Sequence, residues 1–222
     1  LLHSLVDGHP EVSTLPSIYF SEYFNESTWQ KIISHGWEDM VDRFMSIYEV
    51  LFDATSSVPI ETKSKELLHN IGIKEGMGNL GPQKNEILTV DKNSFSLELK
   101  GLMAGYNELS SYTFFGLVHA AYNKALKDDN NKKIIFYHIH NPDIYAQLNF
   151  VTLNSRTNWV MMVREPLQSC EAWVKEKFLK KDYFGCASRI LTMLFEIDNI
   201  VYERQRSIGV RLEDLKSEPK KT

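Results

Sequence analysis

Short apolar runs and longer stretches of helical periodicity alternate along the chain. The runs of strand length lie at residues 11–15, 132–140, 159–163 and 209–215. Apolar residues recur at helical spacing, which predicts helices with one buried face, at residues 38–52, 110–127 and 188–206. Strands that alternate with helices are typical of a parallel sheet with right-handed crossovers. We therefore predict an α/β fold in which helices flank a parallel sheet.

The intervening segments carry weaker signals. Gly8 and Pro10 are stop signals that end a short helix at residues 1–7. Four glycines predict a loop at residues 71–81, which has no GxGxxG fingerprint and no GK[ST] after it. The aromatic-rich stretch 17–25 is interpreted as core packing, with the lining of an acceptor pocket as the alternative. Further helices are expected at residues 27–34, 62–70, 85–90 and 94–102.

The chain is organised around residues 158–173, NWVMMVREPLQSCEAW. The apolar run in this stretch is short and uncharged, which predicts a buried strand of a parallel sheet. Pro166 suits the first turn of a helix, where its missing N–H costs nothing. Arg164 then lies at the carboxyl end of the strand, where open α/β sheets bind ligands. Its fork of donors suits a phosphate or sulfate, and the alternative is an Arg that pairs with a neighbouring carboxylate.

Two histidines close the run at residues 132–140. His138 and His140 stand two positions apart, so their side chains point to the same side of a strand. A histidine is a suitable general base near neutral pH, and an arginine nearby would hold an anionic group. This combination indicates transfer of a charged group to a hydroxyl, with purely structural histidines as the alternative. A metal site is not expected, because no third ligand completes one. His119, on a predicted helix, is expected to be packed.

Composition narrows the class of protein. The 222 residues, 43% hydrophobic and 24% charged, suffice for a single domain over residues 1–222. The net charge of −4 gives no general reason to expect nucleic-acid binding. No apolar run approaches the roughly 20 residues that span a membrane. Cys170 and Cys186 make neither a disulfide framework nor a zinc pattern, so a reducing, cytoplasmic compartment is expected.

Several segments resemble the sulfotransferases, a family with a P-loop-like α/β fold that uses 3′-phosphoadenylyl sulfate (PAPS). LLHSLVDGHPEV, residues 1–12, resembles the segment after the family's 5′-phosphosulfate loop, commonly RSGTT. Residues 158–173 resemble the strand, turn and helix that bind the 3′-phosphate, usually Arg-Asp-Pro followed by a Ser. GVRLEDLKSEP, residues 209–219, resembles the late Tyr-Glu-Asp-Leu strand. HIHNP, residues 138–142, resembles more weakly the Lys-Thr-His-x-Pro run of the cytosolic branch.

The resemblance implies a nucleotide-binding transferase that moves the sulfuryl group of PAPS to a hydroxyl-bearing acceptor, without a metal. It places the general base on His140 and its basic partner on His138. It makes Arg164 the ligand of the 3′-phosphate. The family's Ser stands eight residues after this Arg, where the chain has Ala172, so Ser169 is the nearest substitute. The class of the acceptor is not indicated.

Departures from the family keep alternatives open. The phosphosulfate loop would lie before Leu1, so we expect a fragment clipped at its front, and the charged end leaves a clipped back open. Other branches use a Glu base, for which Glu22 or Glu26 is available. Another P-loop-type transferase, such as a small-molecule kinase, would need a GxxxxGK[ST] loop upstream and Mg²⁺. Ala172 and the missing loop favour a non-catalytic relative that only binds.

Overall fold

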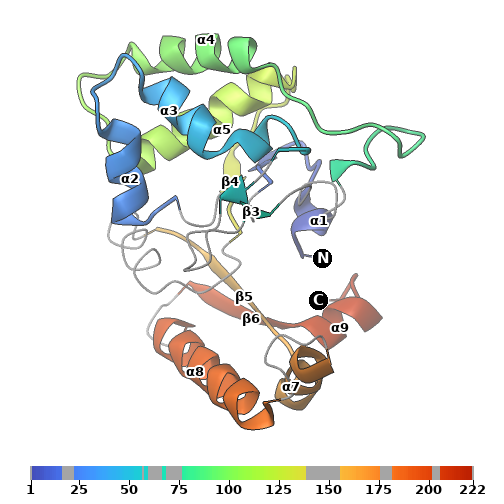
Figure 1. The fold of residues 1–222 in the computed structure, drawn as a ribbon. Coiled ribbons are helices and arrows are strands. Elements are labelled where there is room, and N and C mark those ends of the chain that lie inside the picture. Colours follow the sequence, from blue (N-terminus) through green and yellow to red (C-terminus); the bar gives the residue numbers. More distant parts are fainter. Residues whose placement is uncertain are drawn as a thin grey trace. The chain divides into compact units, whose positions relative to one another are not determined.

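Figure 1 shows the fold of this protein as a computed structural model. The structure describes residues 2–16, 23–56, 58–59, 67–68, 77–138, 156–175, 182–201 and 206–221. Its contacts divide the chain into two compact units, Leu1–Leu153 and Asn154–Thr222, which are described in turn. Each unit combines helices with a pair of parallel strands, so the predicted α/β character is confirmed. Among the described residues, the parallel strands form two separate pairs rather than the single sheet that was predicted. The assignment of residues 1–222 to a single domain stays a prediction.

The first unit contains most of the helices. Its elements are α1 (Leu2–Val6), β1 (Val12–Thr14), α2 (Glu26–Ile33), α3 (Met40–Ile47), the 3₁₀ turn η2 (Glu49–Leu51), β2 (Val58–Pro59), β3 (Leu67–Leu68), α4 (Lys92–Met103), α5 (Ser111–Ala125) and β4 (Ile134–Phe136). β1 pairs in parallel with β4, in the register Val12 to Ile134 and Thr14 to Phe136. β2 and β3 form a separate antiparallel pair. The first and second apolar runs of the sequence thus form one parallel pair.

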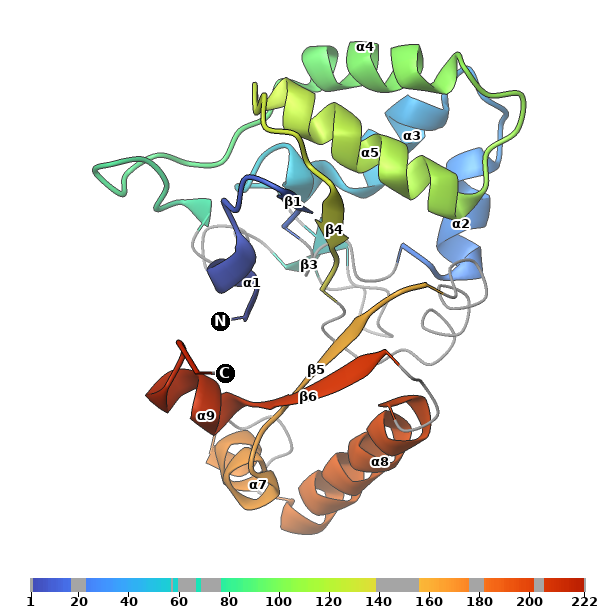
Figure 2. The same cartoon turned by 180° about the vertical axis from the view of Figure 1, so that it is seen from behind.

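An aromatic core holds the helices of this unit together. α4 packs along α5, with α3 beside α4 (Figures 1 and 2). The ring of Phe95 lies at the centre, 4.8 Å from the ring of Phe52 and 6.0 Å from that of Phe44, measured between centroids. Edge and offset contacts of this kind stabilise aromatic pairs beyond the area that they bury. The core therefore depends on side chains that are far apart in the sequence.

The aromatic-rich stretch contributes to the same core. Tyr23 and Phe24 are 0% and 3% exposed, and the hydroxyl of Tyr23 donates to the carbonyl of Ser111 at 2.6 Å. Core packing is thus confirmed for these two side chains, and neither is available to line an acceptor pocket. Tyr19 and Phe20 lie outside the described residues.

The second unit contains residues 158–173, the stretch around which the sequence is organised. Its elements are β5 (Trp159–Val163), α7 (Pro166–Lys175), α8 (Tyr183–Val201), β6 (Ser207–Arg211) and α9 (Leu212–Ser217). β5 and β6 are parallel, and α7 and α8 lie on the same side of this pair (Figures 1 and 2). The strand predicted at residues 159–163 and the helix that starts at Pro166 are both confirmed.

One part of that prediction is wrong. β5 was expected to be fully buried, but its side chains alternate between half-buried and exposed. Val160 and Met162 are 39% and 40% exposed. Alternation follows from the two-residue period of a strand, because α7 and α8 cover only one face of the pair.

Two predicted helices of the first unit are also wrong. Residues 85–90 are not helical, because their backbone bonds to residues 52–54, directly after η2. The N–H of Ala54 donates to the carbonyl of Leu88 at 3.1 Å, and that of Val90 donates to the carbonyl of Phe52 at 2.8 Å. In the helix expected at residues 62–70, the described residues Leu67–Leu68 form strand β3.

Several boundaries differ from the predicted ones. β4 stops at Phe136, opposite Thr14, the last residue of β1, and Pro16, two residues after Thr14, has no N–H to donate to a longer pair. The stretch 209–215 forms the end of β6 and then α9, whose first turn carries acidic residues suited to a helix start. α8 begins at Tyr183 because Asp182 caps it, accepting from the N–H of Gly185 at 2.9 Å. The predicted helix 38–52 divides into α3 and η2.

Within the described ranges, no helix is both long and apolar enough to cross a lipid bilayer.

Candidate functional site

Two arginines end the parallel strands of the second unit at the same edge. In the register of the pair, Val163 of β5 lies opposite Arg211 of β6, and Arg164 follows Val163 directly. Both arginine side chains are exposed. A parallel register brings the carboxyl ends of two strands together, although these residues are far apart in the sequence. Arg164 was predicted as a site residue, whereas Arg211 was missed. Arg211 could have been found only by assuming that the final apolar run pairs with residues 159–163, because that pairing brings the two strand ends together.

A carboxylate holds the turn that follows Arg164. The N–H of Glu165 donates to Oε1 of Glu213, on α9, at 3.1 Å. This bond and one from the N–H of Glu213 itself, with the nearby charges of Arg211 and Arg164, lower the pKa of Glu213. Glu213 is therefore ionised at neutral pH. Its position near both guanidinium groups was not predicted from the sequence.

The alternative role for Arg164, an ion pair with a neighbouring carboxylate, is not seen among the described residues. No ion pair within 4.0 Å joins Arg164 to an acid among the residues that the structure describes. Glu213 is close enough for the charge of Arg164 to lower its pKa, but it bonds the backbone of Glu165 rather than the guanidinium. The guanidinium of Arg164 thus remains available to an anion.

The polar side chains at the beginning of α7 form hydrogen bonds with the backbone of the same segment. A side-chain oxygen of Glu165 accepts from the N–H of Gln168 at 2.6 Å, which caps the helix. The hydroxyl of Ser169 donates to the carbonyl of Glu165 at 3.0 Å, a bond to the preceding turn that is common for serine in helices. To donate to a phosphate, Ser169 has to exchange this bond. Ala172, one turn further along α7, is half-buried and offers no hydroxyl.

The histidine part of the predicted site belongs to the first unit. His138 lies two residues beyond β4 and is half-buried. Its ring stacks on that of His3 from α1, with centroids 6.5 Å apart and planes tilted by 26°. Nε2 of His3 lies 3.1 Å from the carbonyl oxygen of Leu15. His3 was missed as a neighbour of His138, because nothing in the sequence indicates that α1 packs beside the end of β4.

Other candidate bases are partly outside the described residues. His140 and Glu22 both lie there, so the prediction that His138 and His140 face the same side stays a prediction. Glu26 is exposed on α2, where its carboxylate accepts from the side-chain amide of Gln30 at 2.7 Å. Glu26 is thus accessible to solvent and bonded within its own helix.

His119 has a structural role, as predicted. Nδ1 of His119 lies 2.9 Å from the hydroxyl of Ser13 on β1, and the side-chain amide of Asn123 donates to the same hydroxyl at 2.9 Å. Burial lowers the pKa of His119 to about 3. A histidine at 2% exposure has no access to an acceptor, so Ser13 and His119 do not form a nucleophile and base.

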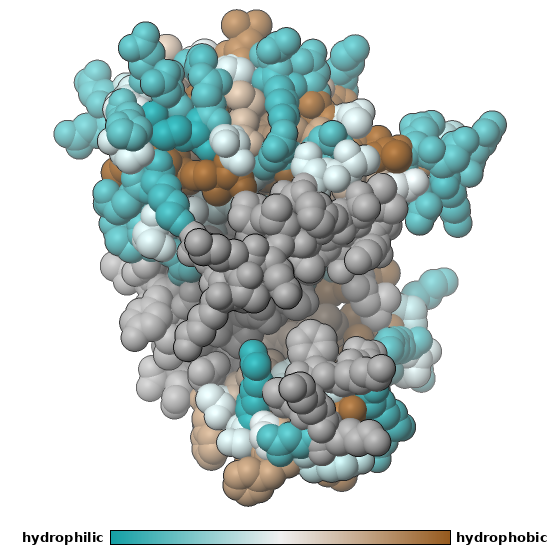
Figure 3. Space-filling view, in the orientation of Figure 1, coloured by the Kyte–Doolittle hydropathy of each residue, from teal (hydrophilic) through white to brown (hydrophobic). Residues whose placement is uncertain are grey.

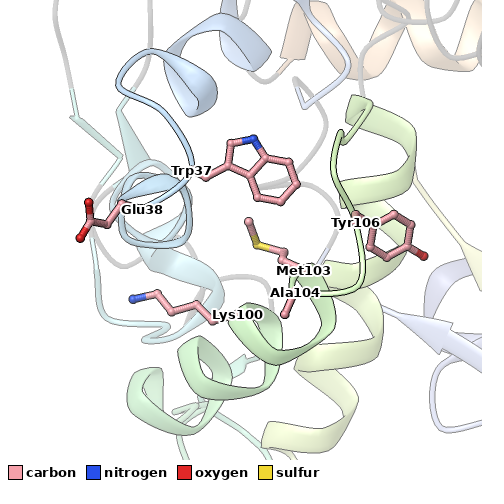
Figure 4. A pocket seen from close by; sticks show the side chains of 6 residues that line it. All are labelled: Trp37, Glu38, Lys100, Met103, Ala104 and Tyr106. Carbon is pink, nitrogen blue, oxygen red and sulfur yellow. The ribbon is translucent and has the colours of Figure 1, made fainter.

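A shallow hollow lies elsewhere on the first unit, between the turn before α3 and the end of α4. Its lining consists of Trp37, Glu38, Lys100, Met103, Ala104 and Tyr106. Figure 4 shows the indole of Trp37 facing Met103, with Glu38 and Lys100 to one side. Figure 3 shows hydrophilic side chains over much of the surface of the first unit, with hydrophobic patches between them. No residue of the predicted site lines this hollow.

No three side chains of the metal-binding types come together among the described residues. Comparison of the chain with protein-family models, with curated protein sequences and with solved structures finds no match.

Proposed function

We propose that this chain is a sulfotransferase domain that moves the sulfuryl group of PAPS to an acceptor hydroxyl, in a P-loop-like arrangement of its strands. The observation that carries the proposal is the strand, turn and helix around Arg164. An exposed guanidinium stands at the carboxyl end of a parallel strand, and the helix starts at Pro166. This is the local structure that the resemblance of residues 158–173 to the 3′-phosphate segment requires.

The chemistry of the site fits an anionic nucleotide. Arg164 and Arg211 supply two permanent positive charges at one strand edge, and a guanidinium binds phosphate oxygens through paired N–H donors. Arg164 holds the 3′-phosphate, and Ser169 adds a hydroxyl if its bond to Glu165 is exchanged. PAPS supplies the activated sulfuryl group when it is bound.

The remaining roles concern the acceptor. His140 accepts the proton of the acceptor hydroxyl as its oxygen bonds to sulfur and the bond from sulfur to the phosphate oxygen of PAPS breaks, which releases adenosine 3′,5′-bisphosphate. His138 is the basic partner of His140. Such proton transfer contributes typically about 10²–10⁴-fold to a rate. The other requirement is an in-line position of the acceptor, as in phosphoryl transfer. Neither role of the chain needs a metal ion.

His140→Ala tests the base. In the full-length protein, transfer of radiolabelled sulfate from PAPS to a panel of hydroxyl acceptors should fall by about 10²–10⁴-fold, because the acceptor proton loses its base. His35→Ala is the matched control, since His35 is exposed in the turn after α2 and should not affect transfer. If His140→Ala keeps the normal rate, the base is Glu22 or Glu26 instead.

A non-catalytic binding domain is the second candidate, and two observations favour it. Ala172 replaces the expected hydroxyl, and the hydroxyl of Ser169 is bonded within its own helix. Such a protein would bind adenosine 3′,5′-bisphosphate or PAPS without transferring sulfate to any acceptor of the panel.

A further inference from the structure

We propose that Glu213 is a positioning residue with two effects on the proposed phosphate site. It fixes the turn that presents Arg164 to the phosphate, and its negative charge lowers the affinity of Arg164 and Arg211 for that phosphate. The inference rests on the proposed function and adds a residue to that site. Glu213 itself does not touch the anion. Its two effects have opposite signs, and they come from two different properties of one carboxylate.

The first effect is a hydrogen bond to the backbone. Oε1 of Glu213 accepts from the N–H of Glu165, the residue directly after Arg164. Glu165 in turn caps α7 with its carboxylate, so the turn is fixed on both sides. The direction in which the Arg164 side chain leaves β5 depends on this short stretch of backbone. Removing the acceptor therefore loosens the presentation of the guanidinium.

The second effect is electrostatic. Glu213 stands two residues after Arg211, and its Oε1 bonds the N–H of the residue that follows Arg164, so the charges of both arginines act on its carboxylate. Interaction between charges is mutual. A negative charge at residue 213 therefore offsets part of the positive potential that attracts a phosphate to this strand edge. Oε2 of Glu213 is buried and has no hydrogen-bond partner among the described residues, so one oxygen of the group is not needed for the turn.

Two substitutions separate these effects. Glu213→Gln keeps a carbonyl oxygen that can accept from Glu165 but removes the charge. Glu213→Ala removes both. For adenosine 3′,5′-bisphosphate binding to the full-length protein, measured by calorimetry, Glu213→Gln should lower Kd by about two- to fivefold, the range of a charge interaction that solvent screens, as it does at the exposed arginines. Glu213→Ala should raise Kd by roughly tenfold, as expected when a hydrogen bond to a charged group is lost.

The matched control is Asp214→Asn. Asp214 is the neighbouring acid on α9, and it is exposed. Its substitution removes the same charge without touching the Glu165 N–H, so Kd should change by less than about twofold. If both Glu213 variants tighten binding, Glu213 is only a competing charge and the positioning role is overturned. If neither changes Kd in protein that remains folded, both effects are overturned.

Hydrogen exchange separates this inference from the proposed function. The amide of Glu165, followed by NMR without ligand, should exchange slowly in wild type and Glu213→Gln and at least about tenfold faster in Glu213→Ala. Equal exchange in the three proteins overturns the positioning role. A wild type that does not bind the nucleotide, but shows this exchange pattern, overturns the sulfotransferase proposal and supports Glu213 as the residue that holds the Arg164 turn.

Discussion

At the residue scale, the buried trio of Ser13, His119 and Asn123 ties β1 to α5. The imidazole of His119 is kept neutral by burial, which lowers its pKa to about 3 from the ordinary value of 6.5. Protonation in place would put an uncompensated charge into the core of the first unit. The trio therefore makes the stability of this unit sensitive to pH.

The sign of this dependence follows from the two pKa values. Between pH 6.5 and about 3 the unfolded chain binds a proton at this residue that the folded chain does not. The contribution of neutral His119 to the free energy of unfolding is thus complete above pH 6.5. It falls as the pH decreases, by up to about 1.4 kcal/mol per pH unit. Urea unfolding at several pH values should show a shallower slope for His119→Gln than for wild type. Equal slopes in this window would rule the mechanism out.

Residue types alone indicated that His119 is packed, but not what packs against it. Its partner Ser13 is 106 positions away, and only the fold brings the two together. The same is true of Glu213, whose bond to Glu165 spans 48 positions. Local sequence patterns do not reveal such pairs, because neither residue of a pair stands out from the other residues of its own segment.

At the element scale, side-chain caps decide where two of the core helices start. The carboxylate of Asp91 accepts from the N–H groups of Asn93 and Ser94, at 2.9 and 3.3 Å, and begins α4. The hydroxyl of Ser110 accepts from the N–H of Thr113 at 3.0 Å and begins α5. Each cap satisfies backbone donors that would otherwise have no partner within the helix.

Asp91→Ala removes the cap of α4. We expect the free energy of unfolding to fall by about 1 kcal/mol, the usual cost of losing such a residue. Asp39→Ala is the control, because Asp39 occupies the same position before α3 but makes no capping bond with its side chain. Chemical denaturation of the two variants measures the difference. An equal loss in both would show that the capping bond of Asp91 is not what stabilises α4.

Elements with strong local signals were predicted well, and those that depend on distant partners were not. Strand β5 and the start of α7 follow from one apolar run and one proline. The segment 85–90 was wrongly expected to be helical, since its backbone bonds to Phe52 and Ala54 instead. Local periodicity is a weak guide wherever tertiary hydrogen bonds compete with it.

At the scale of the whole molecule, each of the two parallel strand pairs leads to residues of the proposed site. β1 and β4 lead to His138, and β5 and β6 lead to Arg164 and Arg211. From the sequence, Arg164 was expected at a strand end, but a second arginine beside it depends on the register of β5 with β6. The assignment of these ends to one sulfotransferase site stays a proposal that the order of the resembling segments supports.

The most direct test is calorimetry of the full-length protein with adenosine 3′,5′-bisphosphate. We expect wild type to bind, and Arg164→Ala to lose about 1.5–3 kcal/mol of binding free energy, the cost of a charge-assisted hydrogen bond. Arg189→Ala is the control, because it removes the same charge from α8, where Arg189 lies over the ring of Trp173 at 5.9 Å. Its affinity should equal that of wild type. Equal affinity of Arg164→Ala and wild type, or no binding by wild type, would contradict the account.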